Sequence, residues 1–254
     1  MTAIALGLIA ALVGLWALLT ATGAVSTDIL PTVGSTAQAF GHIVSGSEGL
    51  HNLATTGLEV LGAFVISAPV AVALGYALGE IKRHNSPLGR ALDNALSTLL
   101  ATPKFTLLPI LIVVLGAGYW EKVTYAMGDG MIVLLVGTAA GAYTVEGQVR
   151  TLAHSLRMSR WQFFRKVYLP GALPIIVESL RLCIILIIAA TLLADMYISN
   201  SGIGYLISQW GSLYDLPSLF AGVALVGILA MIVSACFRAV EVRVSRWRVS
   251  GGKW

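Results

Sequence analysis

Residues 150–174 read RTLAHSLRMSRWQFFRKVYLPGALP, and residues 175–198 continue the chain as IIVESLRLCIILIIAATLLADMYI. The second stretch is apolar over most of its length, and about 20 mostly apolar residues suffice for a helix to cross about 30 Å of hydrocarbon. The first stretch carries five Lys or Arg side chains between aromatic and aliphatic residues, which makes it too polar to span. We therefore expect a transmembrane helix at about 175–198, preceded at about 146–174 by a segment that lies outside the hydrocarbon.

Apolar runs of similar length recur along the chain and predict an all-α membrane protein with about six transmembrane helices. Of the 254 residues, 57% are apolar and 11% are charged, and the mean hydropathy is +0.86; this composition excludes an ordinary soluble domain. Residues 21–24 resemble a signal-peptide cleavage site, but no Lys or Arg precedes the first run, which favours a retained span. One membrane domain is expected over 1–254, with a polar outer loop at about 23–52. The expected spans lie at about 3–21, 53–79, 91–116, 123–143, 175–198 and 216–240.

Small residues and prolines within these spans predict how the helices pack and bend. Glycine repeats at a spacing of four, which permits close helix approach, and the residues concerned are Gly75, Gly79, Gly137 and Gly141. Pro103 and Pro109 each remove a backbone hydrogen bond, so we expect the third span to be bent.

Positive charge is distributed unevenly between alternate loops. One side of the membrane would hold only Lys122. Because cytoplasmic loops retain Lys and Arg, both termini and the 146–174 segment are expected on the cytoplasmic side of a bacterial plasma membrane. The basic residues form no aromatic-interleaved patch, so lipid and not nucleic acid is the expected neighbour. The residues on the cytoplasmic side would be Lys82, Arg83, Arg90, Arg150, Arg157, Arg160, Arg165, Lys166, Arg238, Arg243, Arg246, Arg248 and Lys253.

The stretch AHSL at residues 153–156, with SRWQFFRKVYLPGALP at residues 159–174, resembles the cytoplasmic EAA loop of ABC-importer permeases. The resemblance implies a short coupling helix that docks on an ATP-binding subunit. Aromatic side chains inside a cationic rim are also typical of an interface hot spot. The alternative that the residues leave open is an interfacial helix on anionic lipid. The implied docking residues are Ser155, Leu156, Arg157, Met158, Ser159, Arg160, Trp161 and Phe164, and the implied loop end is Leu169, Pro170, Gly171, Leu173 and Pro174.

This loop departs from the family pattern at two positions. Thr151 stands where the family has Glu, and Arg157 stands where it has Gly. The divergence fits either a specialised, matched ATPase or a heterodimer in which the other permease keeps the standard loop.

Two further stretches resemble the branch of this family that handles nitrate, taurine and alkanesulfonates. One is the proline-bracketed segment from Thr102-Pro103 to Leu107-Leu108-Pro109, followed by Gly116, and the other is ADM at 194–196 followed by SGIGYL at 201–206. Together with the loop, the resemblance covers most of residues 53–247 and implies the fold of a type I importer permease. The branch usually has Arg where this chain has Glu59, which indicates a different solute or a different partner contact.

Charged residues inside the expected spans are candidates for a translocation path, because a charge that faces lipid at mid-helix costs about 3 kcal/mol or more. Lys104 lies on the order of 20 Å along its helix from Arg90. It either lines the path and attracts an anionic solute, pairs with a carboxylate such as Glu59, or snorkels. Asp195 either contacts solute or makes a structural interhelical hydrogen bond. The path candidates are Glu59, Lys104, Phe105, Thr106, Asp195 and Met196, with an outer glycine turn at Ser201, Gly202 and Gly204.

Several motifs of enzymes are missing from the sequence. It contains no GxxxxGK[ST] phosphate loop, no HExxH pair and no GxSxG elbow, so neither ATP hydrolysis nor an intramembrane hydrolase is predicted for this chain. The four His residues are dispersed, and no metal site is predicted. We expect no cofactor on this chain, with ATP and Mg²⁺ bound by a partner ATPase.

The expected function is that of a membrane-spanning permease subunit in an ATP-driven importer, not an enzyme. The resemblance implies two ATPase subunits, a second permease copy or a different paired permease, and a periplasmic or lipid-anchored solute-binding protein. A small organic anion such as a sulfonate or carboxylate, or nitrate, is favoured as the solute; bicarbonate and a heterocyclic vitamin precursor stay open. The rivals are a secondary transporter or channel that acts without an ATPase, and a structural membrane scaffold.

Overall fold

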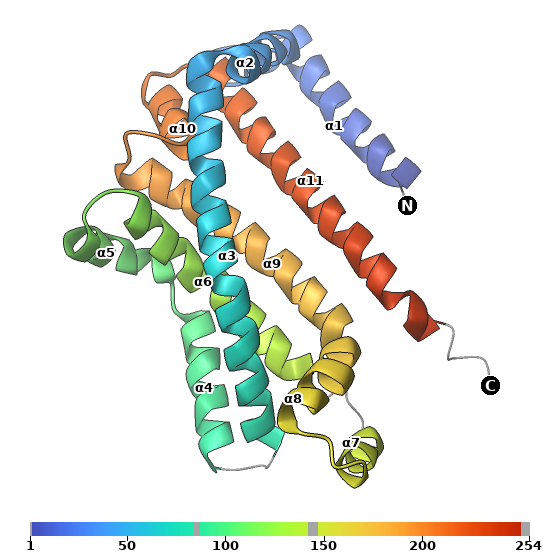
Figure 1. Cartoon of the computed structure of the whole chain (residues 1–254). Helices are drawn as coiled ribbons and strands as arrows, with labels where there is room; N and C mark the ends of the chain where they lie inside the picture. The colour runs from blue at the N-terminus through green and yellow to red at the C-terminus, as the bar shows by residue number, and fades with distance from the viewer. Residues whose placement is uncertain (1, 84–86, 142–146, 250–254) are drawn as a thin grey trace. The chain divides into compact units, whose positions relative to one another are not determined.

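The computed structural model describes residues 2–83, 87–141 and 147–249, and every element in these ranges is helical (Figure 1). The elements are α1 (Thr2–Ala21), α2 (Val33–Ser45), α3 (Ser47–Arg83), α4 (Pro87–Ala101), the 3-10 helix η1 (Lys104–Leu107), α5 (Leu108–Leu115), α6 (Tyr119–Gly141), α7 (Gly147–Ser155), α8 (Arg160–Phe163), the π-helix η3 (Phe164–Tyr168), α9 (Leu169–Ile198), α10 (Ile203–Ser212) and α11 (Leu216–Val249).

The predicted all-α membrane architecture is confirmed by the length and composition of these helices. Among the described residues, four helical stretches are long and apolar enough to cross a membrane, and they cover Ser47–Lys82, Tyr119–Gly141, Arg160–Tyr197 and Leu216–Val244. The bent pair of Pro87–Ala101 with Lys104–Leu115 makes a fifth if it forms one span, and α1 contributes a shorter apolar helix at Gly7–Ala21.

The third expected span is broken and not merely bent. Its two parts meet at an angle of 83°, and the break lies at Thr102 and Pro103, between α4 and η1. Pro109 has a different role from the one expected, because it lies in the first turn of α5, where a missing N–H leaves no hydrogen bond unmade. The bend therefore lies at Thr102 and Pro103 and not at Pro109.

The segments between the expected spans contain more helix than the sequence indicated. The polar segment at 23–52 includes α2, whose N-terminus is capped where Thr32 Oγ1 accepts a hydrogen bond from the Ser35 N–H at 3.1 Å. At the other end of the chain, α8, η3 and α9 follow one another without a gap, so the helix of the fifth span begins at Arg160 and not near 175. Residues 142–143, at the expected end of the fourth span, and Glu146 lie outside the described residues.

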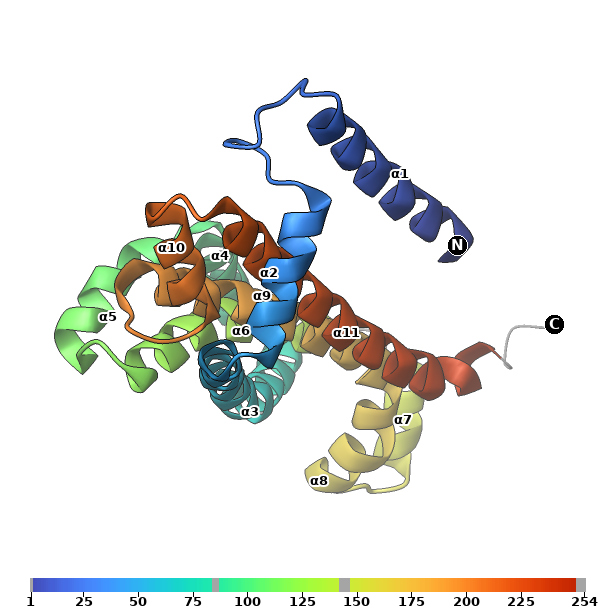
Figure 2. The same cartoon turned by 90° about the horizontal axis from the view of Figure 1, so that it is seen from above.

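The chain forms two compact units. The first contains residues 1–58 and 192–229, and the second contains residues 59–191 and 230–254, so α3, α9 and α11 contribute to both. In the first unit, α2 and α10 pack on the first half of α11 (Figure 2) through a core made of Ile43, Ile203, Leu206, Ile207, Ala221 and Leu225. In the same unit α1 is tied to the segment before α2, because Trp16 Nε1 donates to the Pro31 carbonyl at 2.8 Å.

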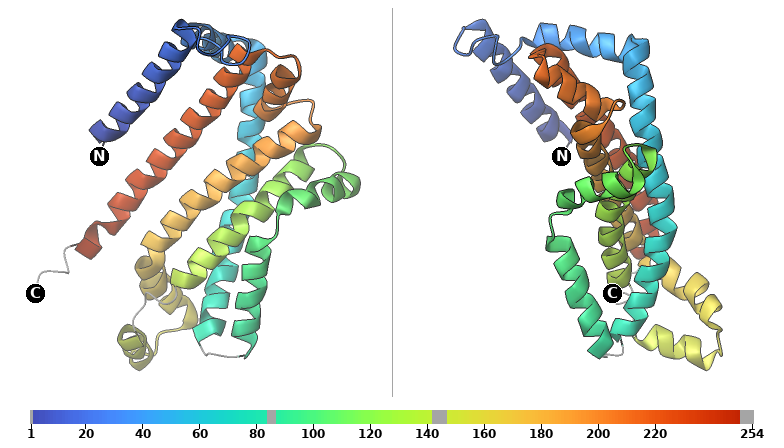
Figure 3. Two further views of the ribbon diagram at one scale, coloured as in Figure 1. Left: turned by 180° about the vertical axis from the view of Figure 1, so that it is seen from behind. Right: turned by 90° about the vertical axis from the view of Figure 1, so that its left-hand side faces the viewer.

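In the second unit, Gly75, Gly137 and Gly141 mark points of very close helix contact, as the glycine spacing predicted. A Cβ added to Gly75 on α3 would lie 2.6 Å from the Leu135 carbonyl oxygen on α6. A Cβ on Gly137 of α6 would collide with the Ser179 side chain on α9. Figure 3 shows α4 beside the C-terminal part of α3 and α5 turned away from α4. The core at the end of this unit is made of Ala153, Phe163, Tyr168, Ala172 and Ile176.

Candidate functional site

The segment from α7 to η3 is held in a defined shape by its own sequence. Ser159 and Gln162 form a capping box at the start of α8: Gln162 N–H donates to Ser159 Oγ at 3.2 Å, and Ser159 N–H donates to Gln162 Oε1 at 2.9 Å. The turn before it passes through Arg157 with φ = +48°. This left-handed region favours glycine, so the position keeps the conformation that a glycine would adopt although the residue is an arginine.

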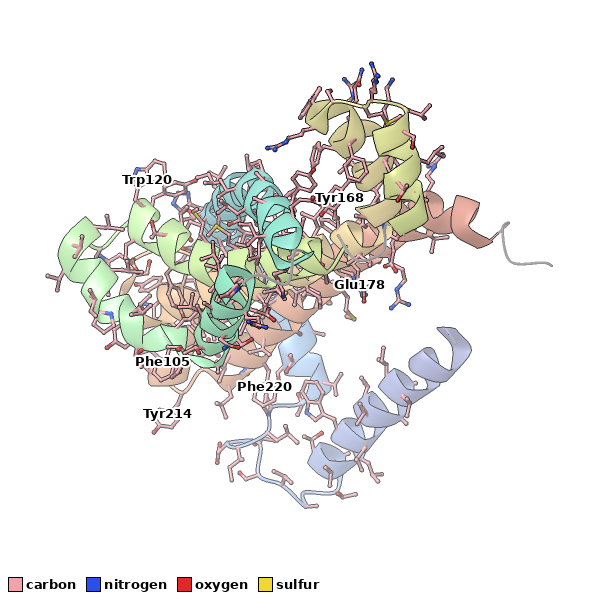
Figure 4. All side chains as sticks on the ribbon, turned by 90° about the horizontal axis from the view of Figure 1, so that it is seen from below. Phe105, Trp120, Tyr168, Glu178, Tyr214 and Phe220 are labelled. Carbon is pink, nitrogen blue, oxygen red and sulfur yellow. The ribbon has the colours of Figure 1, made fainter. Side chains whose placement is uncertain are left out.

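Aromatic side chains fix the inner face of this segment to α3 and α6 of the same unit. Tyr168 is fully buried, and its hydroxyl donates to the Thr138 carbonyl of α6 at 2.8 Å. The Tyr76 ring of α3 lies 4.5 Å from the Tyr168 ring and 4.8 Å from the Phe164 ring, and Figure 4 shows Tyr168 on the side of its own helix that faces α3. Phe164, expected among the docking residues, is thus part of this cluster and secures the segment to α3.

The outer face of the same segment combines apolar and cationic side chains. Trp161 is 64% exposed, and its ring stacks on Phe164 at 5.6 Å. The exposed neighbours include Leu152, Leu156, Arg157, Arg160, Arg165 and Lys166. Residues 147–177 contain no Asp or Glu, so no carboxylate within this stretch offsets its positive charge. We name the exposed residues from Leu152 to Lys166 the docking face.

The expected loop end is part of a helix. Leu169, Pro170 and Gly171 form the first turn of α9, and Leu173 and Pro174 follow within it. Pro170 has no N–H to donate, and the π-register of η3 lies directly before it, which lets the helix continue through this position. The docking face is therefore attached to α9 without a flexible joint.

A second candidate site lies at the break between α4 and η1. Lys104 Nζ is 3.1 Å from Asp129 Oδ1 on α6, and the two side chains are 15% and 24% exposed. Phe105 projects from η1 and is exposed (Figure 4). The Thr106 hydroxyl donates to the Pro103 carbonyl at 2.8 Å and helps to close the turn.

A second charged pair is sealed inside the second unit. Lys122 Nζ lies 2.8 Å from Glu59 Oε1, and the side chains are only 4% and 3% exposed. The structure therefore decides between the partners considered for Glu59, which pairs with Lys122 and not with Lys104. Lys122 itself is a buried residue in the first turns of α6.

The glycine turn before α10 closes a buried network in the first unit. The Thr56 hydroxyl donates to Asp195 Oδ2 at 2.8 Å and accepts from the Ile203 N–H at 2.8 Å, while the Gly202 N–H donates to Asn52 Oδ1 at 2.7 Å. Gly202 has φ = +107°, and a Cβ there would collide with the Asp195 carboxylate. The interhelical hydrogen bond considered for Asp195 is thus present.

The sequence alone did not identify several of these residues as part of a site. Asn52 and Thr56 lie four residues apart on α3 and so share one face, which was the available signal. Asp129 is a lone carboxylate within an apolar span, and a charge of that kind indicates a nearby partner. Among the expected path residues of the second unit, Lys104 and Glu59 have different partners, Asp129 and Lys122. Among those of the first unit, Asp195 accepts from Thr56, Ser201 belongs to the glycine turn and Met196 is exposed. No group of three potential metal ligands occurs among the described residues.

Comparison with known proteins gives consistent matches. Residues 71–248 match the family described as binding-protein-dependent transport system inner membrane component. A Brucella abortus protein named as an ABC transporter permease is 24% identical over 250 residues, which are 98% of this chain and 97% of that protein. A Bacillus subtilis permease protein named for aliphatic sulfonates transport is 24% identical over 241 residues, covering 95% of this chain and 86% of that protein.

Among solved structures, the chain is similar in fold to one in the inward-facing MetNI methionine ABC transporter. The TM-score is 0.64 at 19% sequence identity, and the match covers 78% of this chain and 94% of the other. This likeness confirms the type I importer fold predicted from the sequence.

Proposed function

Because the chain belongs to the family of binding-protein-dependent transport system inner membrane components, we propose that this permease moves its solute inward by using ATP that separate subunits hydrolyse. The solute would be delivered by a binding protein on the outer side of the bacterial plasma membrane. The permease would act with a second copy of itself or with a different paired permease, and alternating access would follow from the closing and opening of two docked ATPases.

The docking face is the observation that supports this proposal. The docking face is cationic and apolar. The buried side of the same segment is attached to α3 through Tyr76 and to α6 through the hydrogen bond from Tyr168 to Thr138. Because cores of packed side chains transmit displacement with little compression, a pull on the docking face would move α3, α6 and α9 together. A helix that merely rested on lipid would need no such attachment.

The solute path is proposed to involve Lys104, Phe105 and Thr106, which border the break in the third span. The name of the Bacillus subtilis relative and the ammonium of Lys104 both favour a small organic anion, such as a sulfonate or a carboxylate, or nitrate. Met196 remains a path candidate in the first unit. Glu59 and Asp195 are buried to within 2% and 1% exposure, so we assign them the role of positioning helices and not that of contacting solute.

A docking surface for the binding protein is proposed on the first unit. The turn between α10 and α11 exposes Leu213 and Tyr214, and Figure 4 shows Tyr214 projecting away from the helices. The buried network at Gly202 and Asp195 would hold α10 firmly beneath that surface.

The proposal is tested by removing the indole at the centre of the docking face. Trp161→Ala should lower the affinity for co-expressed ATPase subunits by about thirtyfold, because truncating a hot-spot aromatic costs about 2 kcal/mol or more. Trp120→Ala is the matched control, because Trp120 is 62% exposed but lies at the start of α6. Co-purification and the affinity of the two variants are the measurements.

The orientation can be measured on the same protein. In a Cys236→Ser background, Ser155→Cys should react with an impermeant thiol reagent in inverted vesicles and stay unlabelled in intact cells. Full retention of the ATPase by Trp161→Ala, or labelling of residue 155 from outside, would contradict docking through this face. A wild-type protein that transports without any ATPase would favour the secondary transporter.

A further inference from the structure

The ion pair at the helix break differs from the other ion pairs of the described residues in both depth and access. Lys82 pairs with Asp93 where the end of α3 meets α4, and Glu59 pairs with Lys122 in a sealed interior. Lys104 lies instead at the break of the bent helix pair, and Asp129 lies within Tyr119–Gly141, which is long and apolar enough to span. Both side chains are partly exposed.

The position of Asp129 along its own helix gives the depth. It lies ten residues after Tyr119 and twelve before Gly141, hence about 15 Å from one end of α6 and about 18 Å from the other. This is close to the middle of about 30 Å of hydrocarbon. Charges at this depth face the bundle interior or a water-filled path, because lipid does not solvate them.

The backbone beside Lys104 gives a second, independent indication. Thr102 and Pro103 lie outside any helix and are exposed in this chain. Irregular backbone at membrane depth is tolerated only where protein covers it or where it lines water. On the α6 side, a Cβ added to Gly128, the neighbour of Asp129, would meet nothing within 4 Å. The pair thus borders open space at the break.

We propose that Asp129 is the internal counter-ion of Lys104 and that it competes with the acidic group of the solute for this ammonium. The inference rests on the proposed function, and it adds a residue that sets which solutes bind. Without solute, the pair joins η1 to α6 across the break. An arriving sulfonate or carboxylate takes the place of the Asp129 carboxylate on Lys104, and Asp129 turns to the water of the path. Solute binding would therefore break the ion pair that joins η1 to α6.

This arrangement also restricts the charge of the solute. A lone Lys104 would attract every small anion, including chloride. Because the carboxylate of Asp129 already neutralises the site at 3.1 Å, an anion binds only if its own contacts exceed those of the pair. Asp129 therefore acts as a filter against weakly bound anions.

The experiment measures the local charge at the break with thiol reagents of opposite sign. Phe105→Cys is made in the Cys236→Ser background, because Phe105 is exposed beside Lys104 while Cys183 is buried. The rates of modification by the anionic sulfonatoethyl and the cationic trimethylammonioethyl methanethiosulfonates are compared. Asp129→Asn should raise the anionic-to-cationic rate ratio by about tenfold, as expected for one uncompensated charge nearby.

Three further variants make the result specific. Lys104→Met should lower the same ratio by a similar factor, and Asp129→Glu should restore the wild-type value. Asp93→Asn is the control, because it removes a carboxylate from another ion pair in the same unit and should leave the ratio unchanged. A structural role for Asp129 would change the melting temperature without changing the ratio.

Two outcomes would overturn the inference. One is a Phe105→Cys protein that neither reagent modifies, since the break would then not border water; the other is an Asp129→Asn protein with the wild-type ratio. Retention of co-expressed ATPase subunits by these same preparations shows whether the proposed function still stands, because docking on the ATPase does not depend on Asp129.

Discussion

Breaking the buried ion pair between Glu59 and Lys122 should be the most damaging single change in the second unit. Lys122→Met leaves the Glu59 carboxylate, which is 2% exposed, without the ammonium 2.8 Å away. Removing one partner of a buried pair costs about 3–5 kcal/mol, because the remaining charge stays desolvated. For a protein of this size about 1 kcal/mol shifts the melting temperature by about 2–4 °C, so the expected loss is about 6–20 °C.

The assay is thermal melting of detergent-purified protein, followed by loss of the monodisperse peak on size exclusion. The double variant Glu59→Met with Lys122→Met should melt close to wild type, because replacing both charges by apolar side chains of similar length removes the desolvation cost as well. Asp93→Asn is the control for an accessible pair, since the Asp93 side chain is 50% exposed and such pairs contribute about 0–1 kcal/mol. If Lys122→Met melts no lower than Asp93→Asn, or if the double variant is the least stable, the reasoning is refuted.

Two further predictions concern the glycine turn and the docking face. Thr56→Val removes a donor to Asp195 and an acceptor for Ile203. This change should cost about 1–3 kcal/mol and lower the melting temperature. Thr55→Val is the control, because it loses only a hydrogen bond within its own helix and should leave the melting temperature unchanged. Arg157→Gly should raise the melting temperature by a few degrees, because the left-handed conformation costs an L-residue about 1–2 kcal/mol. The affinity of this variant for the ATPase should fall, because the guanidinium is lost. A lowered melting temperature would show that the backbone of this turn is not strained.

The features that sequence reasoning predicted are those that depend on one segment at a time. The apolar run that ends at Ile198 defines a span by its own length and composition. The two Leu-Pro pairs identify the segment before it by its resemblance to the EAA loop. Gly202 was expected to permit irregular backbone, and its φ of +107° agrees with that. Each of these properties is local, so neighbouring residues carry enough information.

The partners of the charged residues are the part that the sequence did not reveal. Lys104 pairs with Asp129 and Glu59 pairs with Lys122, and each pair joins two different elements. The cost of a charge in lipid predicts that a partner exists, but its identity depends on the register and rotation of two packed helices, which a single sequence does not specify. Lys122 is an example: because α6 begins at Tyr119, Lys122 lies within its first turns, and its side chain is buried.

Arg157, which belongs to the docking face, stands where the family resemblance would place glycine. The backbone at Arg157 has φ = +48°, and the capping box of Ser159 and Gln162 follows directly. Glycine adopts this left-handed conformation without strain, whereas arginine adopts it at a conformational cost. Arginine at this position also adds an exposed guanidinium to the turn. Strained backbone points to a role for the side chain that it carries, so of the two explanations for the divergent loop, a matched ATPase or a heterodimer in which the other permease keeps the standard loop, we favour a matched ATPase with acidic residues facing Arg157.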